Sequence, residues 1–282
     1  HQDLPELLQF YHSQRHILHG VYLMPLVQTW KQEEFQYLPD RMTTEDVERL
    51  LAECFPGEDV QFISLGLSSH YRTIAKCFGG VAMPYYGTHP NCESFYLLLS
   101  DGEKYVPVER FLKKTFPDLA ADLLALERKL SARQQRWERS LLGRTLGTLR
   151  LRNFTFRLLG QVGALRVALK HVCFGRMLKG RGLSKVYHAM ALVGGQLLGR
   201  NFAELSARHS AIQGSLIVII LPLEDDPIME TERLERCPSV HVTYHPRTGE
   251  FQYIPICTWR MVSRQLLSDM ASCYADATGS TQ

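Results

Sequence analysis

The sequence predicts an α/β fold in which a partial parallel βα part, resembling half of a barrel, is followed by a mixed helical and β-hairpin part. Two observations predict it. Apolar runs of strand length alternate with helical patterns near the start of the chain, as in a parallel sheet. Further on, pairs of β-rich runs flank short polar turns, as in hairpins. The 282 residues, 45% hydrophobic and 22% charged, suffice for a sizeable core and are typical of a globular protein.

The expected elements group into three segments. Residues 1–111 would form the partial barrel half with a hairpin, 112–209 a basic helical region, and 210–282 a C-terminal hairpin and helix part. The chain opens on His1 in the middle of a helical pattern, which we interpret as the sign of a fragment or a processed product.

The first segment alternates strands and helices. A near-continuous apolar run over 21–27 predicts a strand buried on both faces, as in a parallel sheet. A helix over 44–54 should begin at Thr43, a preferred capping residue. A strand over 60–66 and a helix over 70–78 follow. These units supply only part of a barrel or of a doubly wound sheet, and the remaining strands would come from upstream of His1.

A hairpin should follow at 95–108, because Asp101-Gly102 separates two apolar, β-rich runs and both residues tolerate a positive φ. The stretch Thr88-His89-Pro90-Asn91-Cys92 leads directly into it. We therefore expect Cys92 on a fixed loop at the mouth of the hairpin.

Residues 128–185 are strongly basic, with fifteen Lys and Arg residues against the single acid Glu138. One interpretation is the solvated face of a helical bundle. The other is a surface for anionic lipid headgroups or another polyanion. The glycines of this region should break it into several helices: Gly160, Gly163, Gly175, Gly180 and Gly182. The net charge of +3 is too small to imply a nucleic-acid partner.

In the last segment, an apolar run over 215–221 predicts a buried strand, and 240–244 should pair with 251–256 as a hairpin. Cys237 precedes this hairpin and Cys257 follows it. A final helix is expected over 260–271.

The cysteines are seven in number and irregularly spaced, which favours reduced thiols over a disulfide framework and a cytoplasmic location. The sequence shows no secretory signal and no apolar run long enough to span a membrane. Four of the cysteines lie in helical patterns and are expected to pack in the core: Cys54, Cys77, Cys173 and Cys273.

Cys92, Cys237 and Cys257 differ because they lie at the edges of strands and loops. A hairpin can bring its two ends together, so Cys237 and Cys257 could be neighbours. Thiolates with a fourth ligand would suit a [4Fe–4S] cluster or a Zn²⁺ site. The chain contains neither CxxC nor CxxxCxxC, so any metal site must be assembled from distant segments.

Three stretches together resemble radical S-adenosylmethionine enzymes of the tetraether lipid synthase-like group. His89 to Cys92, with Val106-Pro107-Val108-Glu109-Arg110-Phe111, is similar to that group's H-P-x-C … V-P-[IL]-T-R-F segment. Residues 23–47 resemble its strand–QPV–loop–TxxDL segment in the later half of the barrel, and 224–257 resemble its cysteine-containing C-terminal element. The likeness is weak across 112–210.

The resemblance implies that Cys92, Cys237 and Cys257 hold an auxiliary iron–sulfur cluster, with His89, Arg110 and His241 as polar partners nearby. It implies a protein that activates an unreactive C–H bond, on a lipid chain or on another substrate. The CxxxCxxC that would bind the S-adenosylmethionine-cleaving cluster is absent from the chain, so S-adenosylmethionine would be a cofactor only if upstream sequence supplies that motif.

The alternative is a non-catalytic binding module. In that interpretation the α/β part would dock on a membrane surface or a partner protein through residues 128–185, and a zinc ion could stabilise it.

Overall fold

The computed structural model describes residues 3–27, 36, 42–78, 88–139, 150–224, 229–245 and 248–279. The helices are α1 (Leu4–Ser13), α2 (Thr44–Glu53), η1 (Leu65–His70, 3₁₀), α3 (Arg72–Cys77), η2 (Val108–Phe111, 3₁₀), α4 (Phe116–Arg139), α6 (Arg150–His171), α7 (Phe174–Met177), α8 (Leu183–Leu197), α9 (Phe202–His209), α10 (Thr231–Glu235) and α11 (Ile256–Gly279). The strands are β1 (Gly20–Leu23), β2 (Ile63–Ser64), β3 (Ser94–Ser100), β4 (Tyr105–Pro107), β5 (Gly214–Ile220), β6 (Val240–His245) and β7 (Glu250–Pro255).

The main sheet is mixed, with the strand order β1-β5-β3-β2 and with β4 paired to β3. β1 and β5 run parallel, whereas β3 runs antiparallel to each of its partners β5, β4 and β2. The predicted α/β class is thus confirmed. The central position of β5 means that the sheet combines strands from the first and third expected segments.

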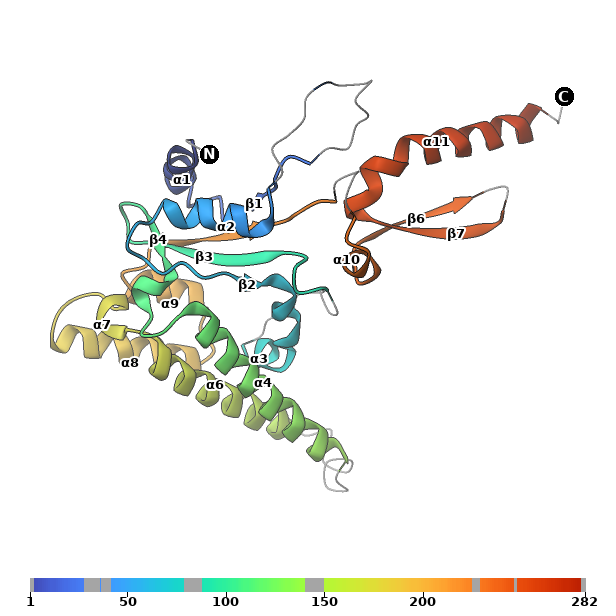
Figure 1. Ribbon diagram of the computed structural model, residues 1–282. Coiled ribbons are helices and arrows are strands. Elements are labelled where there is room, and N and C mark those ends of the chain that lie inside the picture. Colours follow the sequence, from blue (N-terminus) through green and yellow to red (C-terminus); the bar gives the residue numbers. More distant parts are fainter. Residues whose placement is uncertain are drawn as a thin grey trace.

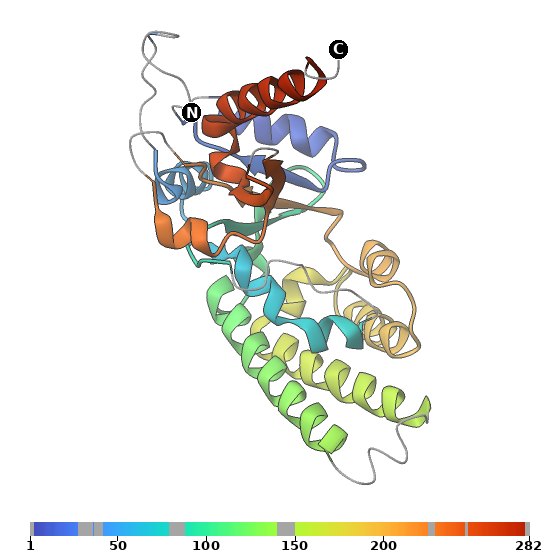
Figure 2. The ribbon, with the colours of Figure 1, turned by 90° about the vertical axis from the view of Figure 1, so that its right-hand side faces the viewer.

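Helices lie on both sides of this sheet (Figure 1). α1 and α2 lie on one side, and the helices from α3 to α9 lie on the other. The second sheet, β6–β7, stands with α10 and α11 beyond one end of the main sheet. Figure 2 shows the same layers after a quarter turn, with the long helices α4 and α6 side by side. The part that contains Cys237 and Cys257 thus follows β5 in the chain.

The core is centred on the pairing of β3 with β5. Tyr96 lies opposite Val218 and Leu98 lies opposite Leu216, and all four side chains are 0% exposed. Directly opposed residues in an antiparallel pair share a face of the sheet, so these four form one continuous buried patch. The intervening residue Ile217 points to the other face and is 36% exposed.

Three local predictions from the sequence are confirmed. Thr43 caps α2 in a capping box with Asp46, as its position before the helix indicated. The turn between β3 and β4 contains Gly102 at a φ of 106°, and Asp101 Oδ1 accepts hydrogen bonds from the backbone N–H groups of Glu103 and Lys104. The hairpin between Cys237 and Cys257 forms as β6–β7.

The prediction of a strand buried on both faces at 21–27 is wrong. β1 ends at Leu23, and the side chains of Tyr22, Met24 and Leu26 are each more than half exposed. β1 lies at the edge of the main sheet, where one side of the strand has no neighbour among the described strands. An apolar run therefore predicted the strand correctly but overestimated how much of it the sheet covers.

The strand expected at 60–66 is also shorter than predicted. β2 contains only Ile63 and Ser64, and the chain turns at once into η1. β2 pairs antiparallel to β3 at the opposite edge from β1. The alternation of strands and helices thus gave the fold class, but the two expected βα units are not adjacent in the sheet.

Gly160 and Gly163 do not interrupt a helix, contrary to the prediction, since both lie inside α6. A Cβ atom at Gly160 would lie 2.2 Å from Cys77 Sγ, and one at Gly163 would lie 2.6 Å from Leu126 Cδ1. The two glycines therefore permit α3 and α4 to pack closely against α6. Among the described residues, no helix combines the length and the apolar character needed to cross a membrane.

Replacing Leu216 by Ala should lower the free energy of unfolding by about 2–5 kcal/mol, because this side chain of β5 is fully buried opposite Leu98 of β3. The matched control is Ile217→Ala on the exposed face of the same strand, where we expect a loss nearer to about 1 kcal/mol. Urea unfolding of both variants measures the difference, and equal losses would contradict the assigned register.

Candidate functional site

The three cysteines singled out from the sequence lie at the ends of secondary-structure elements. Cys92 closes a turn before β3, in which its backbone N–H donates to the carbonyl of His89 at 3.0 Å. Cys237 follows α10, and its thiol donates to the carbonyl of Ser239 at 3.0 Å. Cys257 is the second residue of α11. The side chains of Cys92 and Cys257 are buried, each 6% exposed, and Cys237 is partly exposed.

The three cysteines lie within electrostatic range of one another, since Cys257 and Cys237 contribute to the pKa of Cys92, and Cys237 contributes to that of Cys257. Burial, together with smaller contributions from the nearby Glu93, Cys257 and Cys237, raises the pKa of Cys92 to about 12. Burial likewise raises the pKa of Cys257 to about 11, with Cys237 acting in the same direction. At neutral pH both buried thiols are therefore protonated.

Proximity of thiols does not by itself make a metal site. Over the part of the chain that the structure describes, no three His, Cys, Asp or Glu side chains are grouped closely enough to hold a metal ion. Of the three thiols, that of Cys237 is the most exposed, in a short connection between α10 and β6.

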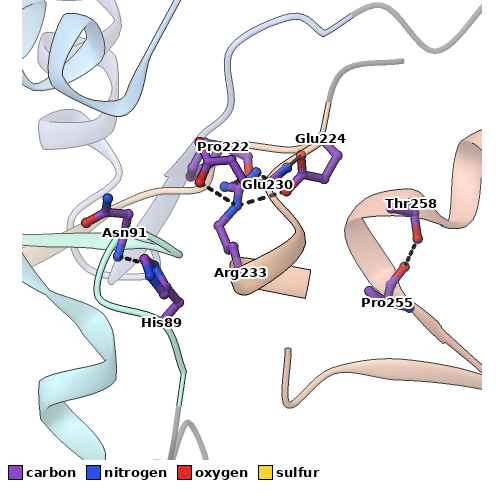
Figure 3. Close-up of polar contacts among 8 residues, drawn as sticks. All are labelled: His89, Asn91, Pro222, Glu224, Glu230, Arg233, Pro255 and Thr258. Atoms are coloured by element: carbon purple, nitrogen blue, oxygen red, sulfur yellow. Dashed lines mark hydrogen bonds and ion pairs between the residues drawn. The ribbon is translucent and has the colours of Figure 1, made fainter. Parts of the chain in front are cut away.

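A buried ion pair joins the end of β5 to α10 (Figure 3). Arg233 Nε donates to Glu224 Oε1 at 2.9 Å, and its Nη1 donates to the carbonyl of Pro222 at 2.7 Å. The other carboxylate oxygen, Glu224 Oε2, accepts from the backbone N–H of Glu230 at 3.0 Å. The two side chains are 6% and 2% exposed. The pair thus fixes the helix that precedes Cys237 against the strand that passes through the core.

Arg233 also lowers the pKa of both Cys92 and Cys257, although burial outweighs it in each case. It is therefore a buried cation within electrostatic range of two thiols. A positive charge in this position stabilises thiolates if they form.

Glu93 supplies a further buried group beside Cys92. Burial raises the pKa of its carboxyl group. Within the described residues its Oε2 atom is buried and has no hydrogen-bond partner. A buried acceptor without a partner costs free energy, so Glu93 is a candidate for interaction with a bound ligand.

The predicted polar partners of the cysteines have different surroundings. His89 Nδ1 accepts a hydrogen bond from the N–H of Asn91 at 3.2 Å, as Figure 3 shows, and its Nε2 lies 3.9 Å from Glu232 of α10. His241 stacks on Trp259, two residues after Cys257, at a centroid distance of 4.3 Å. Arg110 donates to the carboxylate of Glu58 at 2.8 Å. His89 thus lies near α10 and His241 lies near the start of α11, whereas Arg110 is engaged in an ion pair.

Sequence reasoning missed Glu93, Glu224 and Arg233. Glu93 follows a candidate cysteine directly, and that adjacency is a signal that could have identified it. Glu224 and Arg233 are nine residues apart, a spacing that matches neither a helix face nor a strand face. Their burial depends on the tertiary fold.

Comparisons of the chain with protein-family models and with curated proteins find no match.

Replacing Arg233 by Met should destabilise the protein by about 3–5 kcal/mol, because the carboxylate of Glu224 would remain buried without its cation. The control is Arg49→Met, which breaks an exposed pair with Asp46 and should cost at most about 1 kcal/mol. Thermal and urea unfolding provide the measurement. Two variants of equal stability would show that the Arg233 pair does not hold α10 in place.

Proposed function

We propose that this chain is the C-terminal portion of a radical S-adenosylmethionine enzyme and that Cys92, Cys237 and Cys257 bind an auxiliary iron–sulfur cluster. One observation carries the proposal. Thiols from two segments that resemble the tetraether lipid synthase-like group, Cys92 in one and Cys237 and Cys257 in the other, lie within electrostatic range of one another in the fold.

The donor set fits an iron–sulfur cluster in its chemistry. Cysteine thiolates are the usual ligands of such clusters, and Glu93 Oε2 offers a buried oxygen that lacks a hydrogen-bond partner among the described residues. When bound, the cluster would supply one-electron transfer. Arg233 would offset part of the negative charge of the thiolates, and the burial of Cys92 and Cys257 would keep water from the sulfur atoms.

The half-barrel interpretation belongs to the same proposal. β1 and β5 form a parallel pair, and β1 has one side without a partner strand in the described part of the chain. Further parallel strands could add at this edge. The exposed apolar side chains of Tyr22, Met24 and Leu26 are those that additional barrel strands and helices would cover.

The alternative function is a non-catalytic binding module, and one observation favours it. The face of the β6–β7 hairpin that contains Val242, Tyr244, Phe251 and Tyr253 is apolar and largely exposed. Exposed apolar patches of this kind are typical of docking surfaces. In this alternative the three cysteines would hold a structural zinc ion or no metal.

Anaerobic reconstitution with ferrous iron and sulfide tests the proposal. The chain should bind roughly four iron atoms and gain visible absorbance, since a [4Fe–4S] cluster is expected. The triple variant Cys92→Ala/Cys237→Ala/Cys257→Ala should lose both signals.

Iron loading should also decrease as the pH is lowered from about 8.5 to about 6.5, because thiols whose pKa is raised must release their protons on ligation.

The matched control replaces three cysteines that lie elsewhere in the fold, Cys54→Ala/Cys173→Ala/Cys273→Ala, and should load iron like the unmodified chain. An iron content that is the same in both triple variants would refute the cluster. Stoichiometric zinc with no iron, lost in the first triple variant alone, would instead support the zinc-stabilised module.

A further inference from the structure

A cavity of about 760 Å³ lies among α6, α7 and α8, in the helical layer on the side of the sheet away from α1 and α2. Its volume falls within the range of roughly 300–1,000 Å³ that is typical of small-molecule sites. Apart from Phe78, its lining residues belong to the segment where the family resemblance is weak, and none of the three candidate cysteines contributes to its lining. The cavity therefore requires its own explanation.

The cavity exists because its two long helices pack against other partners. α6 packs on α3 and α4 through Gly160 and Gly163, whereas α8 packs on α9 around Leu192 and Leu205. α6 turns toward the cavity a face that contains Ala164 and Ala168, whose small side chains leave the space between the helices open. The walls are largely apolar, which suits a hydrocarbon chain.

One end of the cavity is polar and positively charged. Arg157 of α6 and Arg200, which follows α8, both line it. Gly199 turns the chain there with a φ of 78°, and a Cβ atom at this glycine would lie 3.4 Å from Arg157 Nη2. The Arg157 guanidinium thus lies against the turn that contains Arg200. Neither arginine forms an ion pair with a described carboxylate, so both charges are available to an anion.

Gln196 places an unsatisfied acceptor beside these cations. Its side chain lines the cavity one helical turn before Gly199. The Oε1 atom is buried and has no hydrogen-bond partner among the residues that the structure describes. A hydroxyl donor on a bound molecule would satisfy it.

We propose that this cavity binds a single-chain anionic amphiphile, an acyl chain esterified to glycerol phosphate. The acyl chain of the ligand occupies the apolar space beside Ala164 and Ala168. A glycerol hydroxyl donates to Gln196 Oε1, and the phosphate pairs with Arg157 and Arg200. Guanidinium groups match a phosphate in charge and geometry. This site is independent of the proposed cluster, because no cysteine that would ligate the cluster lines it.

Calorimetric titration of the full chain with 1-oleoyl-glycerol-3-phosphate, below its micellar concentration, tests the proposal. We expect binding of one molecule per chain. Arg157→Gln and Arg200→Gln should each weaken it about tenfold, the order expected for a charged hydrogen bond. The same substitutions should leave binding of uncharged 1-oleoylglycerol almost unchanged. Shorter saturated chains should bind more weakly, by up to about fourfold for each methylene removed.

Two matched controls distinguish the cavity from the basic surface in general. Arg133→Gln removes an exposed cation from α4 and should leave the affinity unchanged. Ala164→Phe fills the cavity and should abolish binding, whereas Ala121→Phe at an exposed position of α4 should not, with circular dichroism confirming that both variants are folded. Unchanged affinity in Ala164→Phe, or equal losses in Arg133→Gln and Arg157→Gln, would overturn the proposal.

Discussion

The structure depends most on the position of β5, which lies between β1 and β3 at the centre of the main sheet. This strand closes the core, because Leu216 and Val218 complete a buried patch with side chains of β3. It also leads directly to Pro222 and Glu224, which fix α10. The candidate site is therefore positioned by a central and largely buried strand, although its cysteines lie on short connections at the ends of elements.

The Arg233–Glu224 pair connects α10, which precedes Cys237, to the end of β5. Burial of two charges carries a large desolvation cost, so such a pair adds little net stability compared with apolar residues of the same size. Here the pair instead positions α10 and supplies a buried positive charge. It fixes the helix before Cys237, and it places one cation near Cys92 and Cys257, whose pKa values burial raises. A cation in this position favours the thiolate forms of these cysteines.

Local chemistry in the sequence predicted the local elements of the fold. Thr43 and Asp46 gave the start of α2, and Asp101-Gly102 gave the β3–β4 turn, because both signals act within a few residues. The sheet order could not be predicted, since β5 enters between β1 and β3 from a distant part of the chain. The same limit applied to the site. Position at strand edges singled out Cys92, Cys237 and Cys257, but Glu93, Glu224 and Arg233 become meaningful only through burial.

The central claim is that the fold brings Cys92 beside Cys257, and thiol cross-linking tests it most directly. Dibromobimane becomes strongly fluorescent when its two bromomethyl groups alkylate neighbouring thiols. The reaction is carried out without denaturant at mildly alkaline pH, in variants that retain only two cysteines. The pair Cys92 and Cys257 should form the fluorescent cross-link, and the pair Cys92 and Cys273 should not. Equal yields from the two pairs, or no cross-link between Cys92 and Cys257 in the folded chain, would contradict the account.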